Sequence, residues 1–354
     1  MNDKVPFRMP RVLAWEVTRR CPLKCRHCRA GAADLPYARE LTTAECRRAL
    51  DSLAAPSSQP PPLVIWTGGE PMLRPDILAL VSHATALGIR SVMAPCGMLV
   101  TEERLRELKS AGVMACSFSL DGPDAASHDA FRGVPGAYDN VTRAMEIAKS
   151  IGMPFQVNTT VSTLNVNRLG EIHAKAVALG AAKLDLFFLV PVGRGSAIAD
   201  YALSDEQTRQ VLNWAFAKAE QGPLAIKETC CPSAPVHWAQ WSAFHTRTVP
   251  QSPNHTLKQS HNPAISSRPC GCLGGRGFAF LSHVGDLQTC GFIDTPCGNL
   301  RDHACDVRAL IAAAANPLGA AGTCRTAEAA EASAHRRSID VPCAASRATG
   351  RARL

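Results

Sequence analysis

An alternation of apolar, strand-like segments with amphipathic, helix-like segments runs through residues 11–220 and limits the fold more than any other feature of the sequence. The predicted strands are residues 11–17, 63–67, 90–94, 113–120, 155–161 and 184–190, and the predicted helices are residues 42–53, 74–87, 102–110, 137–150, 167–179 and 204–220. Thr42 and Glu45 form a capping box at the start of the first helix. The helix lengths and short connections are typical of parallel βαβ units. Periodicity alone fits a partial (β/α)6 barrel and a doubly wound sheet about equally well.

The positions of the unusual residues favour the barrel. They lie at or just beyond the C-terminal ends of the predicted strands, namely residues 21–28, residues 68–71, Ser119 with Asp121, Asn158 with Thr160, and residues 191–193. Barrel enzymes build their active sites on that face. We therefore predict an α/β fold, a partial TIM-like barrel, with a functional site at this end of the strands.

The composition indicates a folded chain with a substantial core. Of the 354 residues, 46% are hydrophobic and 19% are charged, and the mean hydropathy is −0.04. The net charge of +8 is modest, and no run of alternating basic and aromatic residues accompanies it, so nothing indicates nucleic-acid binding. The apolar stretch at residues 186–192 contains Pro191 and is far shorter than the roughly 18 residues that suggest a membrane span.

Beyond residue 220 the pattern changes, and we predict three further segments. Residues 221–269 form a linker or substrate segment, with an aromatic group at His237, Trp238 and Trp241 that could flank a ligand or simply pack. Residues 270–300 form a small module with a β-hairpin that turns at the Gly-Asp pair 285–286. Residues 301–354 are rich in alanine and arginine and have no periodic core face, which predicts an irregular, partly helical tail.

The cysteines point to metal or redox chemistry. The chain has 15 of them and no recognisable secretory leader, which predicts a reducing compartment, the cytoplasm. Cys21, Cys25 and Cys28 are separated by three and then two residues. Three thiolates on one loop cannot complete a zinc tetrahedron, but they can hold three irons of a cubic [4Fe-4S] cluster and leave the fourth iron open to a small molecule. A zinc or structural thiol site is the alternative.

A second motif, Gly68-Gly69-Glu70-Pro71, follows the second predicted strand. Two glycines allow the backbone to approach another segment or a ligand closely, and the carboxylate can receive an ammonium group. A Gly-Gly turn is common, so the motif gains its meaning from its place after an apolar strand and from the cysteine loop upstream.

The cysteine spacing, with His27 just before the last cysteine, resembles the signature of the radical S-adenosylmethionine (SAM) superfamily, and the other motifs agree in order through about residue 220. The resemblance implies that Cys21, Cys25 and Cys28 hold a [4Fe-4S] cluster whose fourth iron is chelated by SAM. Reductive cleavage of SAM would then give a 5'-deoxyadenosyl radical that takes a hydrogen atom from an unactivated carbon.

The resemblance also implies the residues that contact SAM. They are Gly68, Gly69 and Glu70 for the methionyl amine, Ser119 and Arg132 for the carboxylate, Asp121 among the polar contacts at the end of its strand, and Asn158 and Thr160 for the adenosine. Asp121 could instead be a carboxylate at a helix N-terminus, and Arg132 could belong to a surface ion pair. Asn158 and Thr160 could be a buried, hydrogen-bonded pair.

The C-terminal segment resembles the first half of a SPASM/twitch extension, an auxiliary iron-sulfur module. Cys272, Gly285 and Cys290 have its spacing, and Cys270 also fits the first position. The dense second half of the pattern is absent, although Cys297 or Cys324 could serve a truncated module. A translated frameshift from about residue 303 would also explain the composition of the tail, and buried structural thiols are a further alternative.

Within the superfamily the nearest resemblance is to tetrapyrrole-modifying members, including the haem synthases that oxidatively decarboxylate iron-coproporphyrin. It is carried by residues 15–21, 67–72, 93–97, 121–136, 158–160, 229–232 and 272–292. It implies a tetrapyrrole substrate, haem biosynthesis, and an electron donor such as flavodoxin or ferredoxin. The alternatives are a SPASM-type peptide or protein maturase and a non-catalytic iron-sulfur partner.

Overall fold

The structure is a computed structural model that describes residues 9–248, 273–275 and 277–314, with side chains left out for residues 243–248. Cys270, Cys272 and Cys324, which carried part of the predicted iron-sulfur module, lie outside the described residues. No helix in the described ranges is both long enough and apolar enough to cross a membrane.

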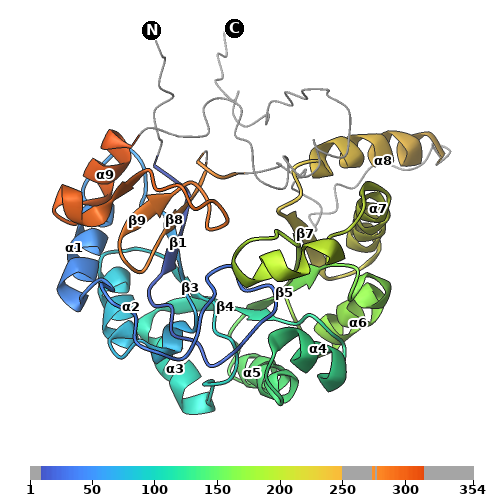
Figure 1. The fold of residues 1–354 in the computed structure, drawn as a ribbon, viewed down its shortest axis with the longest axis horizontal. Helices are drawn as coiled ribbons and strands as arrows, with labels where there is room; N and C mark the ends of the chain where they lie inside the picture. Colours follow the sequence, from blue (N-terminus) through green and yellow to red (C-terminus); the bar gives the residue numbers. More distant parts are fainter. Residues whose placement is uncertain (1–8, 249–272, 276, 315–354) are drawn as a thin grey trace, which may run out of the picture.

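A ten-stranded sheet organises the fold, in the order β10-β9-β8-β1-β2-β3-β4-β5-β6-β7. Strands β8 and β1 to β7 run parallel, whereas β9 and β10 are antiparallel to their neighbours. The strands are β1 (Val12–Glu16), β2 (Leu63–Thr67), β3 (Ser91–Met93), β4 (Val113–Ser119), β5 (Phe155–Val161), β6 (Lys183–Phe188), β7 (Ala225–Thr229), β8 (Phe278–Leu281), β9 (Asp286–Gln288) and β10 (Gly298–Asn299). The sheet curves, and helices cover its outer face, so the fold is a partial TIM-like barrel as predicted (Figure 1).

The helices follow the strands in the predicted order. They are α1 (Thr43–Ala54), α2 (Ile77–Ala86), α3 (Glu102–Ala111), α4 (Ala125–Arg132), α5 (Ala137–Ser150), α6 (Leu169–Leu179), α7 (Asp205–Gln221), α8 (Ala234–Thr248) and α9 (Val307–Ala313), with short 3-10 turns η1 (Pro71–Leu73), η2 (Val166–Arg168), η3 (Gly193–Tyr201) and η5 (Leu300–His303). The predicted capping box of Thr42 and Glu45 is present at α1. Between the sheet and the helices, the stacked rings of Trp15 and Trp66 lie 5.6 Å apart in the core.

Helices α4 and α8 and strands β7 and β10 were not expected from the sequence. Helix α4 is only 8 residues long, too short to give a clear period, but Asp124 caps it by accepting a hydrogen bond from the backbone N–H of Ser127. Strand β7 lies at one edge of the sheet, where β6 is its one partner among the described strands. An edge strand tolerates polar residues, which is why its sequence Ala-Ile-Lys-Glu-Thr lacks an apolar run.

The predicted C-terminal hairpin is confirmed, and it is part of the main sheet. Strands β8 and β9 pair antiparallel, with Leu281 opposite Leu287. Strand β8 also pairs parallel with β1, so the hairpin extends the barrel sheet on the side of the cysteine loop. The domain boundaries drawn from the sequence stay a prediction.

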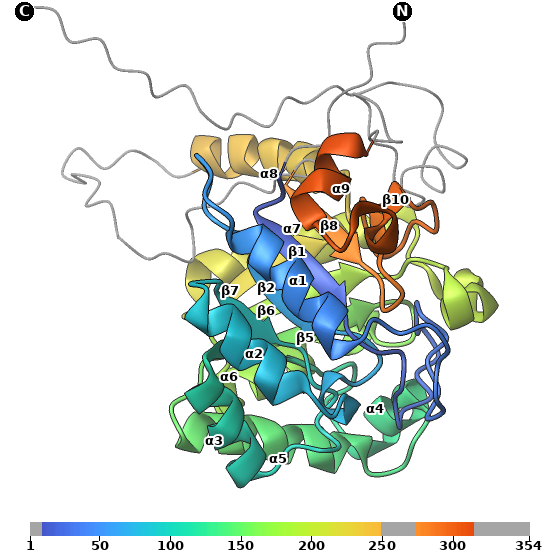
Figure 2. The same ribbon diagram turned by 90° about the vertical axis from the view of Figure 1, so that its left-hand side faces the viewer.

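The prediction that the tail has no core face was wrong for residues 300–314. Val307, Leu310 and Ile311 of α9 are buried, and α9 packs beside α1 (Figures 1 and 2). Arg308 donates hydrogen bonds to the backbone oxygens of Ser52 and Leu53 near the end of α1, at 2.7 and 2.8 Å. The apolar positions i, i+3 and i+4 were hard to detect because they occupy one short stretch among alanines.

Candidate active site at the cysteine loop

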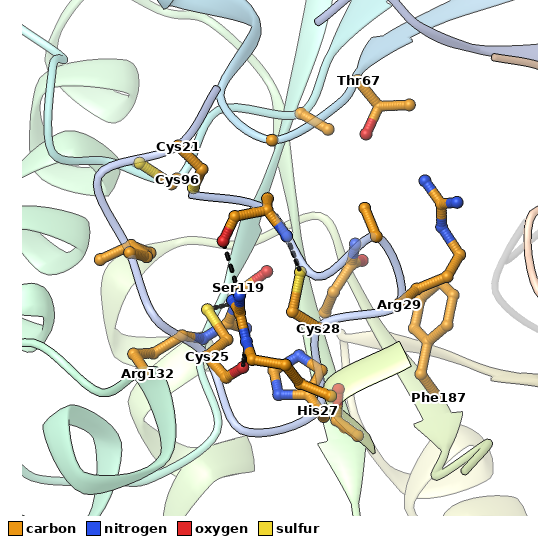
Figure 3. Close-up of a pocket in the computed structure, with 18 of the residues that line it drawn as sticks. Cys21, Cys25, His27, Cys28, Arg29, Thr67, Cys96, Ser119, Arg132 and Phe187 are labelled. Atoms are coloured by element: carbon orange, nitrogen blue, oxygen red, sulfur yellow. Dashed lines mark hydrogen bonds between the residues drawn. The ribbon is translucent and has the colours of Figure 1, made fainter. Parts of the chain in front are cut away.

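A cavity of about 250 Å³ opens at the C-terminal ends of the parallel strands, where the sequence predicted the site. The loop after β1 forms one wall, and residues from the ends of β2, β4, β5 and β6 form the others (Figure 3). Among the predicted site residues, it is lined by Cys21, Cys25, Cys28, Gly68, Gly69, Ser119, Arg132, Asn158 and Thr160. The fold thus brings together nine residues that are spread over 140 positions of the sequence.

The three thiols face this cavity as free cysteines. Burial raises the pKa of Cys25, and the Arg132 guanidinium, whose Nη1 lies 3.6 Å from the Cys25 sulfur, opposes this effect. The Cys28 sulfur accepts a hydrogen bond from the backbone N–H of Ala32 at 3.4 Å. In the described ranges no three His, Cys, Asp or Glu side chains are grouped closely enough to hold one metal ion. Three separate thiols on one cavity wall fit an iron-sulfur cluster, in which each thiolate binds its own iron.

Cys96 belongs to the segment 93–97 that carried the resemblance but was not named as a site residue, and it is a fourth thiol in this cavity. It follows β3, and its side chain lies beside that of Cys21 (Figure 3). A hydrogen bond from the Cys96 thiol lowers the pKa of Cys21, although burial of Cys21 works against it. Its position just beyond a strand end was the signal that could have identified it.

The two glycines of the Gly-Gly-Glu motif are required by close backbone contact. A Cβ atom on Gly68 would lie 2.2 Å from the backbone oxygen of Thr18, and one on Gly69 would lie 2.2 Å from that of Arg20. The backbone N–H groups of Gly69 and Glu70 donate to the same two oxygens, at 2.8 and 2.6 Å. The motif therefore holds the segment that leads into the cysteine loop.

The Glu70 side chain does not line the cavity, unlike the two glycines. Its Oε1 accepts a hydrogen bond from the backbone N–H of Met72 at 2.8 Å, and its Oε2 accepts one from that of Cys96 at 2.5 Å. Burial raises the pKa of this carboxyl group. Each carboxylate oxygen thus already has one backbone donor, and the contact of Glu70 with the amine stays a prediction.

Asp121 is also set back from the cavity, behind Arg132. Its Oδ2 lies 2.5 Å from Nη2 of Arg132, and its Oδ1 accepts a hydrogen bond from the backbone N–H of Thr160 at 2.7 Å. Arg132 is only 9% exposed, so the surface ion pair considered from the sequence is a buried one. The pair joins α4 to β5 and holds the guanidinium beside Cys25.

Ser119 and Asn158 occupy opposed positions on β4 and β5, where both line the cavity. The Asn158 side chain donates to the hydroxyl of Ser117 at 2.7 Å and accepts from Gln156 at 2.8 Å. It therefore has hydrogen-bond partners other than Thr160, which lies two residues along the same strand. The inner wall of the barrel is polar at this point.

The surroundings of His27 disfavour the protonated form of its ring. Its ring stacks on Phe131 with 4.6 Å between the ring centroids. Burial, and then the charges of Arg132 and Arg194, lower its pKa well below the usual range. Its Nδ1 is buried and has no hydrogen-bond partner in the described part of the chain.

The cavity contains further residues that the sequence interpretation missed, namely Arg29, Phe187, Arg194 and Phe292. Arg194 lies in η3 beyond the sixth strand, and it donates to the backbone oxygens of Cys25 and Ala32 at 2.9 and 2.6 Å. The sequence analysis had identified residues 191–193 as unusual, and Arg194 is the next residue along the chain. Phe292 comes from the loop after β9 and is the last residue of the segment 272–292 that carried the resemblance, although it was not named as a site residue.

The remaining predicted residues lie apart from the cavity. Cys290 and Cys297 flank the loop between β9 and β10, and neither lines the cavity. Burial raises the pKa of Cys297. On α8, Trp241 packs against Phe216 of α7 with 5.7 Å between the ring centroids, in agreement with the packing interpretation of the aromatic group. His237 and Trp238 do not line the cavity either.

Comparisons with known proteins agree with this site. Residues 15–174 match the Radical SAM superfamily. The chain is 39% identical to the AdoMet-dependent heme synthase of Nitratidesulfovibrio vulgaris, over 82% of this chain and 76% of that protein. It is 34% identical to the Fe-coproporphyrin III synthase of Methanosarcina barkeri, over 60% of this chain and 51% of that protein. The chain therefore belongs to the radical SAM superfamily.

Solved structures show the same fold. SuiB of Streptococcus suis bound to S-adenosylmethionine matches with a TM-score of 0.60 at 15% identity, over 85% of this chain and 65% of that chain. The enzyme anSMEcpe with bound AdoMet matches with a TM-score of 0.60, over 84% of this chain and 79% of that chain. As a member of this superfamily, the chain is an enzyme that uses a [4Fe-4S] cluster and SAM.

Proposed function

We propose that this enzyme acts in haem biosynthesis and oxidatively decarboxylates propionate side chains of an iron-coproporphyrin-like tetrapyrrole. The observation that carries the proposal is the charge of the cavity. In the described part of the chain, Arg29, Arg132 and Arg194 line it together with the cysteines, and no Asp or Glu does. Such a lining suits ligands with several carboxylates. The relatives named as heme synthases, at 35% to 39% identity, support the same substrate class.

The residues have the following proposed roles. Cys21, Cys25 and Cys28 hold the [4Fe-4S] cluster, and the residues that contact SAM are Gly68, Gly69, Ser119, Arg132, Asn158 and Thr160, all of which line the cavity. Glu70 and Asp121 support this arrangement through Cys96, Thr160 and Arg132. When bound, the cluster and SAM supply a radical that can remove hydrogen from an unactivated carbon.

The protein itself would position the reacting groups and shield them from water. Arg132 and Arg194 fix the cysteine loop, and the walls built from β4, β5 and β6 would surround the bound reactants. Each propionate must lose one hydrogen atom and one electron for each CO2 released. We include in the proposal a one-electron donor of the flavodoxin or ferredoxin class and a reducing compartment such as the cytoplasm, because free thiols are needed for cluster assembly.

An auxiliary iron-sulfur cluster in the C-terminal segment would be a natural acceptor for the departing electron. Cys290 and Cys297 are the described members of its proposed ligand set, and the other members, Cys270 and Cys272, lie outside the described residues. The boundaries of this module at residues 270–300, beside a core at 11–220, belong to the proposal as well.

Anaerobic reconstitution followed by incubation with SAM, a strong reductant and iron-coproporphyrin tests the proposed function. We expect 5'-deoxyadenosine and successive losses of roughly 46 mass units from the porphyrin, which correspond to CO2 plus two hydrogens. An unchanged porphyrin despite SAM cleavage would overturn the substrate and favour a peptide or protein maturase. An absence of SAM cleavage would leave a non-catalytic iron-sulfur partner.

A further inference from the structure

The three arginines of the cavity differ in how many of their N–H donors remain available to a ligand. Arg132 is bound to Asp121 and faces the Cys25 sulfur. Arg194 uses Nε and Nη1 on backbone oxygens of the cysteine loop, and its Nη2 is enclosed by protein without a partner in the described residues. Arg194 therefore serves mainly to hold the loop, whereas Arg132, the proposed partner of the SAM carboxylate, already has one carboxylate beside it.

Arg29 is more available. A single guanidinium nitrogen, Nη2, contacts a carboxylate, that of Glu16, at 2.5 Å. The side chain is 18% exposed, and no described residue accepts a hydrogen bond from its Nε or Nη1. Figure 3 shows Arg29 across the pocket from Cys21 and Cys25, beside Phe187. Arg29 thus presents unused donors at the side of the cavity that lies away from these two thiols.

The position of Arg29 is fixed by a buried network. Glu16, at the end of β1, is 0% exposed and is also bound by Nε of Arg19 at 2.9 Å and by Nδ1 of His283 at 2.8 Å. Burial raises the pKa of Glu16, but His283 and the two arginines outweigh it, and the pKa falls to about 2. The Cζ atom of the Arg29 guanidinium lies over the Phe280 ring, 4.3 Å from its centroid. Arg29 is therefore held rigidly between the cysteine loop and the C-terminal hairpin.

We propose that Arg29 binds a carboxylate of the substrate at the edge of the cavity, and that Glu16 is the residue that positions it. The cavity is smaller than the pockets that enclose a drug-sized ligand, so only one edge of a macrocycle would enter it. The side-chain carboxylates on that edge would reach the cavity residues first. Phe187 and Phe292 line the cavity and offer apolar contact to a flat ring. This inference rests on the proposed function.

The carboxylate could come from two sources, the tetrapyrrole or SAM itself. The inference commits to the tetrapyrrole, because Arg132 and Ser119 already provide a cation and a hydroxyl near Cys25 and are the proposed partners of SAM. Nε and Nη1 of Arg29 carry N–H groups without an acceptor among the described residues, so this guanidinium can donate to a second carboxylate besides Glu16.

Absorbance titration with iron-coproporphyrin, carried out anaerobically on the cluster-loaded enzyme, tests the inference without turnover. The proteins are the wild type, Arg29→Gln, Arg29→Lys and, as a control, Arg106→Gln, which removes an exposed partner of Glu102 on α3. A parallel titration uses the tetramethyl ester of the same porphyrin. We expect Arg29→Gln to weaken binding of the free acid by about 10- to 100-fold. Arg29→Lys should keep part of the affinity, and Arg106→Gln all of it.

The ester distinguishes the carboxylate contact from a general loss of structure. The wild type should prefer the acid to the ester, and Arg29→Gln should lose most of that preference. An unchanged preference in Arg29→Gln would overturn the inference, and so would a loss of SAM affinity in place of porphyrin affinity. If Arg29→Gln loses iron, the same comparison is made on cluster-free proteins. Failure of the wild type to bind either porphyrin would instead refute the proposed function, and the inference with it.

Discussion

The backbone N–H of Cys96 donates a hydrogen bond of 2.5 Å to Oε2 of Glu70, and this bond joins the Gly-Gly-Glu motif to the loop after β3. Glu70 is fully enclosed, and its second oxygen holds the backbone N–H of Met72. The Cys96 thiol in turn lies beside Cys21. The Glu70 carboxylate therefore supports the cysteine loop indirectly, through Cys96. The motif is therefore a support for the site as well as part of its wall.

Glu70→Ala should destabilise the protein and loosen the cysteine loop. The substitution leaves the buried backbone N–H of Met72 and the partly buried one of Cys96 without acceptors, and an unsatisfied buried group costs about 1–3 kcal/mol. We expect a free energy of unfolding lower by about 2–5 kcal/mol and a lower iron content after reconstitution. Denaturant unfolding and iron analysis measure the two effects. Glu102→Ala, at an exposed position of α3, is the control, and equal stability of the two variants would contradict this role.

Gly69→Ala should prevent the close contact between the Gly-Gly-Glu motif and the segment that leads into the cysteine loop. The new methyl group would lie 2.2 Å from the backbone oxygen of Arg20 and 2.4 Å from that of Arg19, distances that force the backbone to move. We expect a loss of about 1–3 kcal/mol in stability and a marked loss of bound iron. Gly170→Ala is a matched control because its Cβ would have no neighbour within 4 Å. Full iron content in Gly69→Ala would show that this contact is dispensable.

Local sequence patterns were enough to predict the scaffold of the barrel. Strands β2 and β5 and helix α5 begin and end at the predicted residues, because each has a clear period and flanking turn residues or caps. The position of the site also followed, since parallel strands bring their C-terminal ends together.

The orientation of individual side chains did not follow from the sequence. Nothing in the motif reveals that the oxygens of Glu70 are already used by backbone donors, because that depends on where the loop after β3 runs. The partnership of Glu16 with His283 joins residues 267 positions apart and arises only because β8 pairs with β1. Contacts of this range depend on the register of the whole sheet.

Glu16 should make the stability of the protein depend on pH in the acid range. Its pKa is lowered from 4.5 to about 2 in the folded protein, because His283, Arg29 and Arg19 outweigh the effect of burial. The ionised group therefore stabilises the fold fully above pH 4.5, and this contribution is lost as the pH falls toward 2. The loss amounts to about 2 kcal/mol by pH 3.

The comparison of wild type with Glu16→Gln isolates this contribution. Denaturant unfolding at pH 6, 4 and 3 should show a difference between the two proteins that shrinks as the pH falls, because the glutamine does not titrate. A difference that stays constant over this range would mean that the buried carboxylate does not carry the effect.

Leu310→Ala tests whether α9 belongs to the folded core. Leu310 is fully buried in the contact with α1, so its truncation should cost about 2–5 kcal/mol in the free energy of unfolding. Ala312→Ser, at an exposed position of the same helix, should change it by less than about 0.5 kcal/mol. Equal stability of the two variants would mean that this helix is not docked in solution.

Replacement of Cys21, Cys25 and Cys28 by alanine should remove one cluster and leave the barrel folded. The three side chains line a cavity and contribute little to the main core, so circular dichroism should be unchanged, whereas iron and sulfide should each fall by about four per chain. Cys46→Ala, on α1 and away from the cavity, should keep the iron of the wild type. Iron that remains in the triple variant would have to be held elsewhere, and its loss on further replacement of Cys290 and Cys297 would assign it to the C-terminal segment. Full retention of wild-type iron by the triple variant would contradict the assignment of these three thiols as cluster ligands.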